Sequence, residues 1–212
     1  GERLVYREGS HVADQLVAEV VRGAAAHLNP GGTAQFLVNW AVLPGEPWEE
    51  RLASWVAGTG LDCWAIERER MDRFAYIEMW LADAGLSGSP RWRPEYERWL
   101  TYFDELGIEE IGMGWIFLTA SGRDVPEIRM ESWPHAVAQP VGEVFARHRA
   151  AVDAARLPTD ELLESRPALT DVVQETIGAP LAADPEHLVL RQRHGLLRAM
   201  TLGTEEAAVL GA

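Results

Sequence analysis

The order of the apolar segments is the feature that most constrains how this chain can fold. A helical pattern of apolar residues over 12–28 is followed by a short apolar run over 34–42, a second helical pattern over 48–57 and a second apolar run over 61–67. Short apolar runs that follow glycine turns are typical of buried central strands, so 34–42 is predicted as one. Helices that alternate with such strands predict an α/β sheet with crossover helices.

The first predicted helix has recognisable boundaries. Ser10 is its predicted N-cap, and the turn 29–32, which reads Asn-Pro-Gly-Gly, ends it because glycine tolerates the left-handed backbone that such a turn requires. The apolar stripe by which we expect it to pack consists of Val12, Leu16, Val20 and Ala24.

Two further helices and a strand complete the first part of the chain. Apolar spacing predicts helices over 74–81 and 96–106 and a strand over 110–119. In that strand Gly112 and Gly114 share one face, where another group can pack closely against the backbone. The other face carries Ile111, Met113, Trp115 and Phe117.

The pattern changes after Gly122. Short strands are predicted over 127–133 and 188–193, with a hairpin turn over 191–198. A helix is predicted over 141–155, with Pro140 at its first position. These features divide the chain into an α/β part, residues 1–121, and an α+β accessory extension, residues 122–212.

Composition excludes several classes of function. The 212 residues carry a formal net charge of −14, which disfavours direct binding of nucleic acid because such binding depends on basic side chains that neutralise phosphates. The single cysteine, Cys63, allows neither an internal disulfide nor a cysteine-rich zinc site, and a cytoplasmic location fits best. No apolar run is long enough to span a bilayer, so no membrane partner is expected.

The order of elements resembles the C-terminal half of a class I S-adenosylmethionine-dependent methyltransferase, a Rossmann-like fold. The turn at 28–32, Leu-Asn-Pro-Gly-Gly, resembles the one that precedes strand 5 in these enzymes. The chain is most similar to a HemK-like, Asn-Pro-Pro-Tyr type, actinobacterial group with a C-terminal extension. The features in common include the stretch 4–9, Asn39-Trp40 and the segment 112–116. The resemblance implies that 34–42, 61–67 and 110–119 are strands 5, 6 and 7, with strand 7 antiparallel between the other two.

The resemblance also implies where a substrate would bind. Tyr6 and Arg7 would follow the catalytic loop and line the substrate entrance. Asn39 and Trp40 lie near the C-terminal end of a strand, the edge at which open α/β sheets bind ligands. For Trp40, packing in the core is the favoured alternative to stacking on a planar substrate.

The chain departs from the methyltransferase pattern in its catalytic parts. It has no glycine-rich loop after a first strand and no Asn-Pro-Pro-Tyr motif, so no catalytic, cofactor-binding or metal-binding residue is assigned within it. We expect S-adenosylmethionine to bind the parent protein and not this chain alone. The expected partner is a missing N-terminal half or another protein, both ends of the chain being read as cuts in a longer one. A trimmed but complete domain is the alternative.

Other readings stay open. The chain could be a non-catalytic protein-interaction module, and half a sheet exposes an edge that favours self-association. Trp92 is the best candidate for an exposed contact, although a structural role is as well supported. The charged run 67–73 is expected to be a solvated strand exit. His187 and His194 lack a third ligand, and Cys63 is expected to be a buried thiol without a chemical role.

Overall fold

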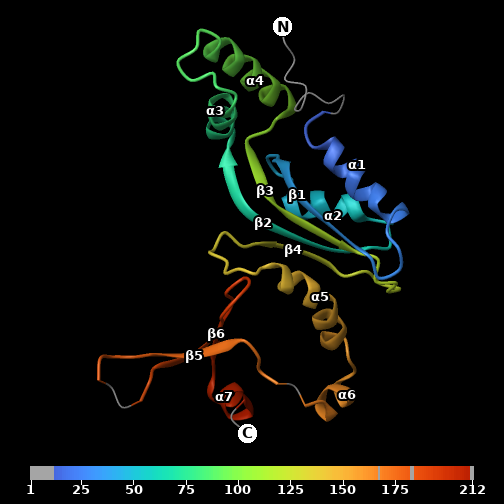
Figure 1. Ribbon diagram of the computed structural model, residues 1–212, viewed down its shortest axis with the longest axis vertical. Helices are drawn as coiled ribbons and strands as arrows, with labels where there is room; N and C mark the ends of the chain where they lie inside the picture. The colour runs from blue at the N-terminus through green and yellow to red at the C-terminus, as the bar shows by residue number, and fades with distance from the viewer. Residues whose placement is uncertain (1–11, 167, 182–183, 211–212) are drawn as a thin grey trace. The chain divides into compact units, whose positions relative to one another are not determined.

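The computed structural model describes residues 12–166, 168–181 and 184–210 (Figure 1). The chain is mixed α/β and forms two compact units, Gly1–Pro134 and His135–Ala212. The boundary expected at 121/122 precedes a strand that pairs within the sheet of the first unit. Among the described residues, no helix has the length and apolar character needed to cross a membrane.

The first unit contains a mixed four-stranded sheet. Its central strand runs antiparallel to both neighbours, and the fourth strand joins parallel to its neighbour. Phe36, Trp64 and Trp115 therefore lie on three neighbouring strands, with the Trp115 strand in the middle and opposite in direction, as expected. In order across the sheet, the strands are β1 (Thr33–Val42), β3 (Glu110–Thr119), β2 (Asp62–Asp72) and β4 (Ile128–Ser132).

The prediction that 34–42 is a buried central strand is wrong for the described residues. β1 lies at the edge of the sheet, and its residues alternate between exposed and half-buried over most of its length. Leu37 is 82% exposed. The sequence misled because the run is apolar on both faces, although only one face of β1 is covered along its whole length.

Helices cover the two faces of this sheet differently. Two of them pack on the face that carries Phe36, and the other two form an antiparallel pair against Ala41 and Ile111 on the opposite face. The first two helices are α1 (Gln15–Gly23), continued by the 3₁₀ turn η1 (Ala24–Ala26), and α2 (Trp48–Val56). The second two are α3 (Arg73–Asp83) and α4 (Trp92–Leu106).

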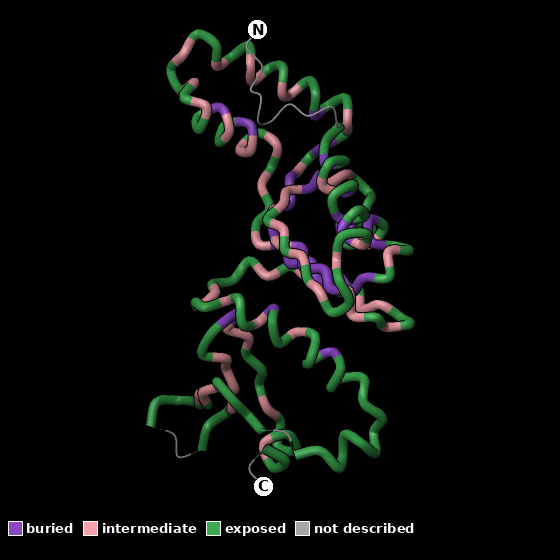
Figure 2. Tube along the Cα trace, turned by 45° about the vertical axis from the view of Figure 1, so that its right-hand side comes forward, coloured by how far each residue is buried: buried purple, intermediate pink, exposed green. Residues whose placement is uncertain are grey.

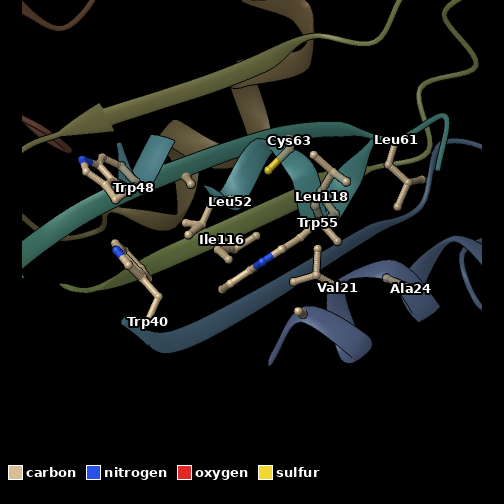
Figure 3. Packing of buried hydrophobic residues seen from close by; sticks show 13 residues of the cluster. Val21, Ala24, Trp40, Trp48, Leu52, Trp55, Leu61, Cys63, Ile116 and Leu118 are labelled. Atoms are coloured by element: carbon tan, nitrogen blue, oxygen red, sulfur yellow. The ribbon is translucent and has the colours of Figure 1, made fainter. Parts of the chain in front are cut away.

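The larger core lies between α1, α2 and the sheet (Figure 3). The indole of Trp55 and the side chains of Leu52 and Val21 meet Ile116 and Leu118 from the middle strand. Each large apolar side chain removed from water in this way contributes about 1.5–3 kcal/mol before the entropy cost of ordering it. The periodicity of α2 predicted its buried face correctly, since Trp48, Leu52, Trp55 and Val56 are all buried.

The predicted stripe of α1 is largely wrong. Val12, Leu16 and Val20 are 42%, 50% and 45% exposed, and the buried residues of α1 are Ala18 and Val21. Ala24, in the turn η1 that follows, is buried as predicted. Helix α1 carries two apolar stripes, and the narrower one packs against β1 and α2. The sequence alone could not show which of the two stripes is buried. The predicted N-cap, Ser10, lies outside the described residues.

The second unit is an α+β arrangement around a three-stranded antiparallel sheet. The helix predicted over 141–155 and the strand and hairpin predicted over 188–198 are present, but Pro140 precedes the N-cap Val141 and is not the first helical residue. The helices are α5 (Gly142–Ala155), α6 (Thr159–Glu164) and α7 (Thr204–Leu210). The strands, in order across the sheet, are β5 (Val172–Ile177), β6 (His187–Gln192) and β7 (Ala199–Leu202).

Candidate functional site

The candidate site lies at the C-terminal end of β1, where α3 and α4 approach the sheet. Of the four predicted substrate residues, Asn39 and Trp40 lie here, on opposite faces of the strand. Tyr6 and Arg7 lie outside the described residues. The structure therefore leaves the predicted grouping of these four side chains untested.

Asn39 is held by α3. Its Nδ2 donates a hydrogen bond to the Tyr76 hydroxyl at 3.2 Å. Tyr76 in turn packs at an angle against the rings of Trp99 and Phe103, with centroids 6.3 and 6.2 Å away. The half-buried Asn39 amide is therefore a polar group held in place by an aromatic hydroxyl at the C-terminal end of β1.

Trp40 is a core residue, in agreement with the alternative that the sequence favoured. It is 1% exposed and stacks on Trp48, with ring centroids 5.3 Å apart and an interplanar angle of 18°. Figure 3 shows the two indoles beside the larger core. Trp40 therefore presents no open ring face to a planar substrate, and any role in binding depends on its edge.

The two glycines of β3 make room for this indole. A Cβ added to Gly112 would lie 2.2 Å from Trp40 Nε1, and one added to Gly114 would lie 2.0 Å from the Ile66 carbonyl oxygen. Both distances are far below van der Waals contact. The predicted close approach at the glycine face is therefore confirmed, and the group that packs there is Trp40.

A buried carboxylate lies next to the same glycine. Glu67 is 4% exposed, and its Oε2 would lie 3.0 Å from a Cβ on Gly112. Arg70 pairs with it at 2.9 Å and reaches Glu110 at 3.4 Å. Trp40 Nε1 is the buried side-chain polar atom without a hydrogen-bond partner among the described residues. The prediction of a solvated charged run is thus wrong for Glu67, because the alternation that places Cys63 and Ala65 in the core continues to Glu67, and the bulge follows only between residues 67 and 69.

A second buried carboxylate, Asp14, binds the backbone near the end of β1. Asp14, 6% exposed, accepts a hydrogen bond from the Ala41 backbone N–H at 2.9 Å and pairs with Arg51 at 2.7 Å. The hydrogen bonds that Arg51 donates to the Asp14 carboxylate raise the pKa of Arg51, so this guanidinium stays charged. No local sequence pattern predicts this pair, since the two residues are 37 positions apart.

The remaining candidates have structural explanations. Trp92 is half-buried within the α3–α4 cluster and borders a shallow hollow of about 500 Å³. Burial raises the pKa of the Cys63 thiol to about 12, so it is not a nucleophile near neutral pH. His194 Nδ1 lies 2.8 Å from Asp171 Oδ1. In the described part of the chain, no group of three or more side chains is arranged to hold a metal ion.

Comparison with known proteins adds no family. No protein-family model matches the chain, and the search of curated proteins finds no match.

Proposed function

We propose that the first unit is the substrate-side part of a class I S-adenosylmethionine-dependent N-methyltransferase and that the second unit is its accessory domain. The observation that carries this proposal is the strand order β1-β3-β2, with β3 antiparallel between two parallel strands. That order is what the resemblance implies for strands 5, 7 and 6. β1 and β2 follow each other in sequence but are separated in the sheet by β3, which is uncommon because sequential strands usually lie next to each other.

The site at the end of β1 supports the same proposal. The Asn39 amide, held by Tyr76, can orient a planar nitrogen acceptor by hydrogen bonding, and the aromatic cluster of α3 and α4 forms an apolar wall beside it. Fixing the acceptor relative to a methyl donor lowers the barrier by positioning alone. The methyl acceptor itself is not specified by these residues.

The described residues do not fit the cofactor. The turn between β1 and α2 contains Pro44 and Pro47, which lack backbone N–H groups, and Glu46, whose charge opposes an anionic or carboxylate ligand. S-adenosylmethionine would supply an activated methyl group, but its binding loop has to come from outside these residues. We therefore derive no chemical step within this chain.

The decisive experiment reads the coding DNA immediately upstream of residue 1. An in-frame glycine-rich loop and an Asn-Pro-Pro-aromatic motif are expected, and the joined protein should transfer a labelled methyl group from S-adenosylmethionine to a nitrogen of its acceptor. Titration calorimetry of the 212-residue chain with S-adenosylmethionine should show no micromolar binding. A stop codon or unrelated upstream sequence would contradict the proposal.

An interaction module is the second candidate, and one observation favours it. The second unit carries an apolar sheet face on which Leu190 lies opposite Met200 and Leu188 lies opposite Leu202. Met200 is 53% exposed. An unrelated upstream sequence, together with capture of a partner protein that Met200→Lys abolishes, would favour this function over the enzyme.

A further inference from the structure

Strand β1 offers an open edge in the described structure. The Val42 carbonyl accepts a hydrogen bond from Glu109 N, whereas the Ala41 N–H points the other way, toward Asp14. Since N–H and C=O directions alternate along a strand, the odd-numbered residues direct their backbone groups away from β3. Within the described residues β1 pairs only with β3, so these groups of Thr33, Gln35, Leu37 and Asn39 face outward.

This edge lacks the protection that natural edge strands carry. Charged side chains, prolines and bulges normally prevent a sheet edge from pairing with another chain. Residues 30–45 contain no charged side chain, although the chain as a whole carries a net charge of −14. β1 has neither proline nor bulge, and its outward-facing Leu37 is 82% exposed.

Helix α1 leaves apolar side chains exposed beside the same edge of β1; the edge and these side chains together are called the β1 flank. Figure 1 shows α1 alongside β1, on the side away from β2. Its exposed stripe, Val12, Leu16 and Val20, contributes nothing to the core that the helix covers. A partner that fits this flank has to supply a strand to β1 and an apolar helix face to α1.

We propose that this flank binds a second copy of the same chain. The two β1 strands pair antiparallel about a two-fold axis at Leu37, which places Leu37 opposite its own copy and Gln35 opposite Asn39. A second copy supplies both a strand and an apolar helix. In this register Leu37 bonds to its own copy and Gln35 bonds to Asn39, whereas Thr33 lies opposite Ala41, whose N–H already bonds to Asp14. The uncharged segment is where two acidic chains approach with least repulsion.

This inference goes beyond the proposed function and competes with it for one surface: in the methyltransferase sheet that we propose, the absent strands would pair with this same edge of β1, so the dimer concerns the 212-residue chain without them. The edge geometry, the absence of charge and the exposed stripe stand whether or not the chain belongs to a methyltransferase. A failed dimer experiment would leave the upstream-sequence test of the enzyme untouched.

Engineered cysteines test the register directly. Paired residues that face each other across an antiparallel ladder have Cα atoms about 5.5 Å apart, within disulfide range. Leu37→Cys in the full chain should therefore form an interchain disulfide under added oxidant, whereas Gln35→Cys, which lies diagonally from its copy, should not. Cys63 is buried and does not compete. Absence of cross-linking by Leu37→Cys, or equal cross-linking by Gln35→Cys, would overturn the proposal.

Sedimentation analysis tests the surface independently. The wild-type chain should be a dimer and Leu37→Lys a monomer, with unchanged circular dichroism because the side chain is exposed. Leu163→Lys is the matched control: this leucine is 79% exposed in α6 and should leave the dimer intact. A monomeric wild type, or a dimer that Leu37→Lys leaves intact, would refute the proposal and point instead to another occupant or another face.

Discussion

The two compact units differ in how they are held together. Figure 2 shows buried residues along the strands and covering helices of the first unit, whereas most residues of the second unit are exposed. The second unit buries four apolar residues among those described: Phe145, Val152, Val189 and Leu196. Its sheet is stabilised instead by strand pairing and by polar contacts such as Arg191 with Glu175 at 2.8 Å.

The first unit is expected to be the more stable of the two. Apolar burial contributes far more per residue than exposed ion pairs, whose individual contributions are usually below about 1 kcal/mol. Local opening should therefore occur at lower free energy in the second unit than in the first. The second unit should therefore open while the first stays folded.

The largest expected effect is a cavity in the first unit. Leu118 is completely buried between the strands and the α1–α2 layer, so Leu118→Ala should lower the free energy of unfolding by about 2–5 kcal/mol in urea denaturation. Leu163→Ala, at an exposed position of α6, should change it by less than about 0.5 kcal/mol. Equal losses of unfolding free energy in the two variants would contradict the expected difference in stability between the two units.

Adding a methyl group at the glycine face of β3 should lower the free energy of unfolding by somewhat less. Gly114→Ala places a methyl group against the Ile66 carbonyl and the Trp40 ring, so we expect a loss of about 1–3 kcal/mol and a changed tryptophan emission spectrum. The control is Gly142→Ala in α5, where nothing lies within 4 Å of the added methyl group. The control should be neutral or gain up to about 1 kcal/mol.

The behaviour of these glycines shows what the sequence could predict. Alternation along 110–119 put Gly112 and Gly114 on one face, and the spacing of Trp48, Leu52 and Trp55 gave the correct face of α2. Both are local patterns with a single dominant period. The sequence also gave the order and directions of β1, β3 and β2, through the resemblance and not through periodicity.

What the sequence missed depends on tertiary contact. In α1, two apolar stripes compete, and only the packing against β1 and α2 decides that Val21 is buried and Leu16 exposed. Asp14 and Arg51 are far apart in sequence, and Glu67 is buried beside Gly112, a residue of another strand. In the candidate site, Asn39 was found from its place in a strand, but its partner Tyr76 could not have been.

Chemical reactivity of Cys63 gives a third test. Burial raises the thiol pKa from its ordinary value of 9.0 to about 12, so the folded chain keeps the proton where the unfolded chain loses it. Stability should therefore fall as pH rises from about 9 toward about 12. At pH 8 a thiol reagent should modify Cys63 only through opening of the first unit.

A cysteine in the second unit sharpens this measurement. In the double variant Cys63→Ala, Val189→Cys, the new thiol is also buried, but we expect it to react faster because the second unit opens at lower free energy. Reaction of both thiols at one common rate would show that the two units open together.

The smallest expected effect is electrostatic and confined to the second unit. Glu175 accepts a hydrogen bond from Arg191, which lowers the carboxyl pKa below its ordinary value of 4.5. Because the folded pKa is depressed, the contribution of this pair is present above that ordinary value and is lost as pH falls through the folded pKa. Acidification should thus slightly speed amide hydrogen exchange in β5 and β6. Loss of this pair should not affect exchange in β1 and β3, which belong to the first unit.

Carbon-detected NMR titration of the Glu175 carboxyl measures the same pair directly. The titration should show the lowered pKa in the wild type, and Arg191→Gln should abolish the shift. A carboxyl that titrates identically in both proteins would contradict the prediction, because the Glu175–Arg191 pair would then contribute nothing to this sheet.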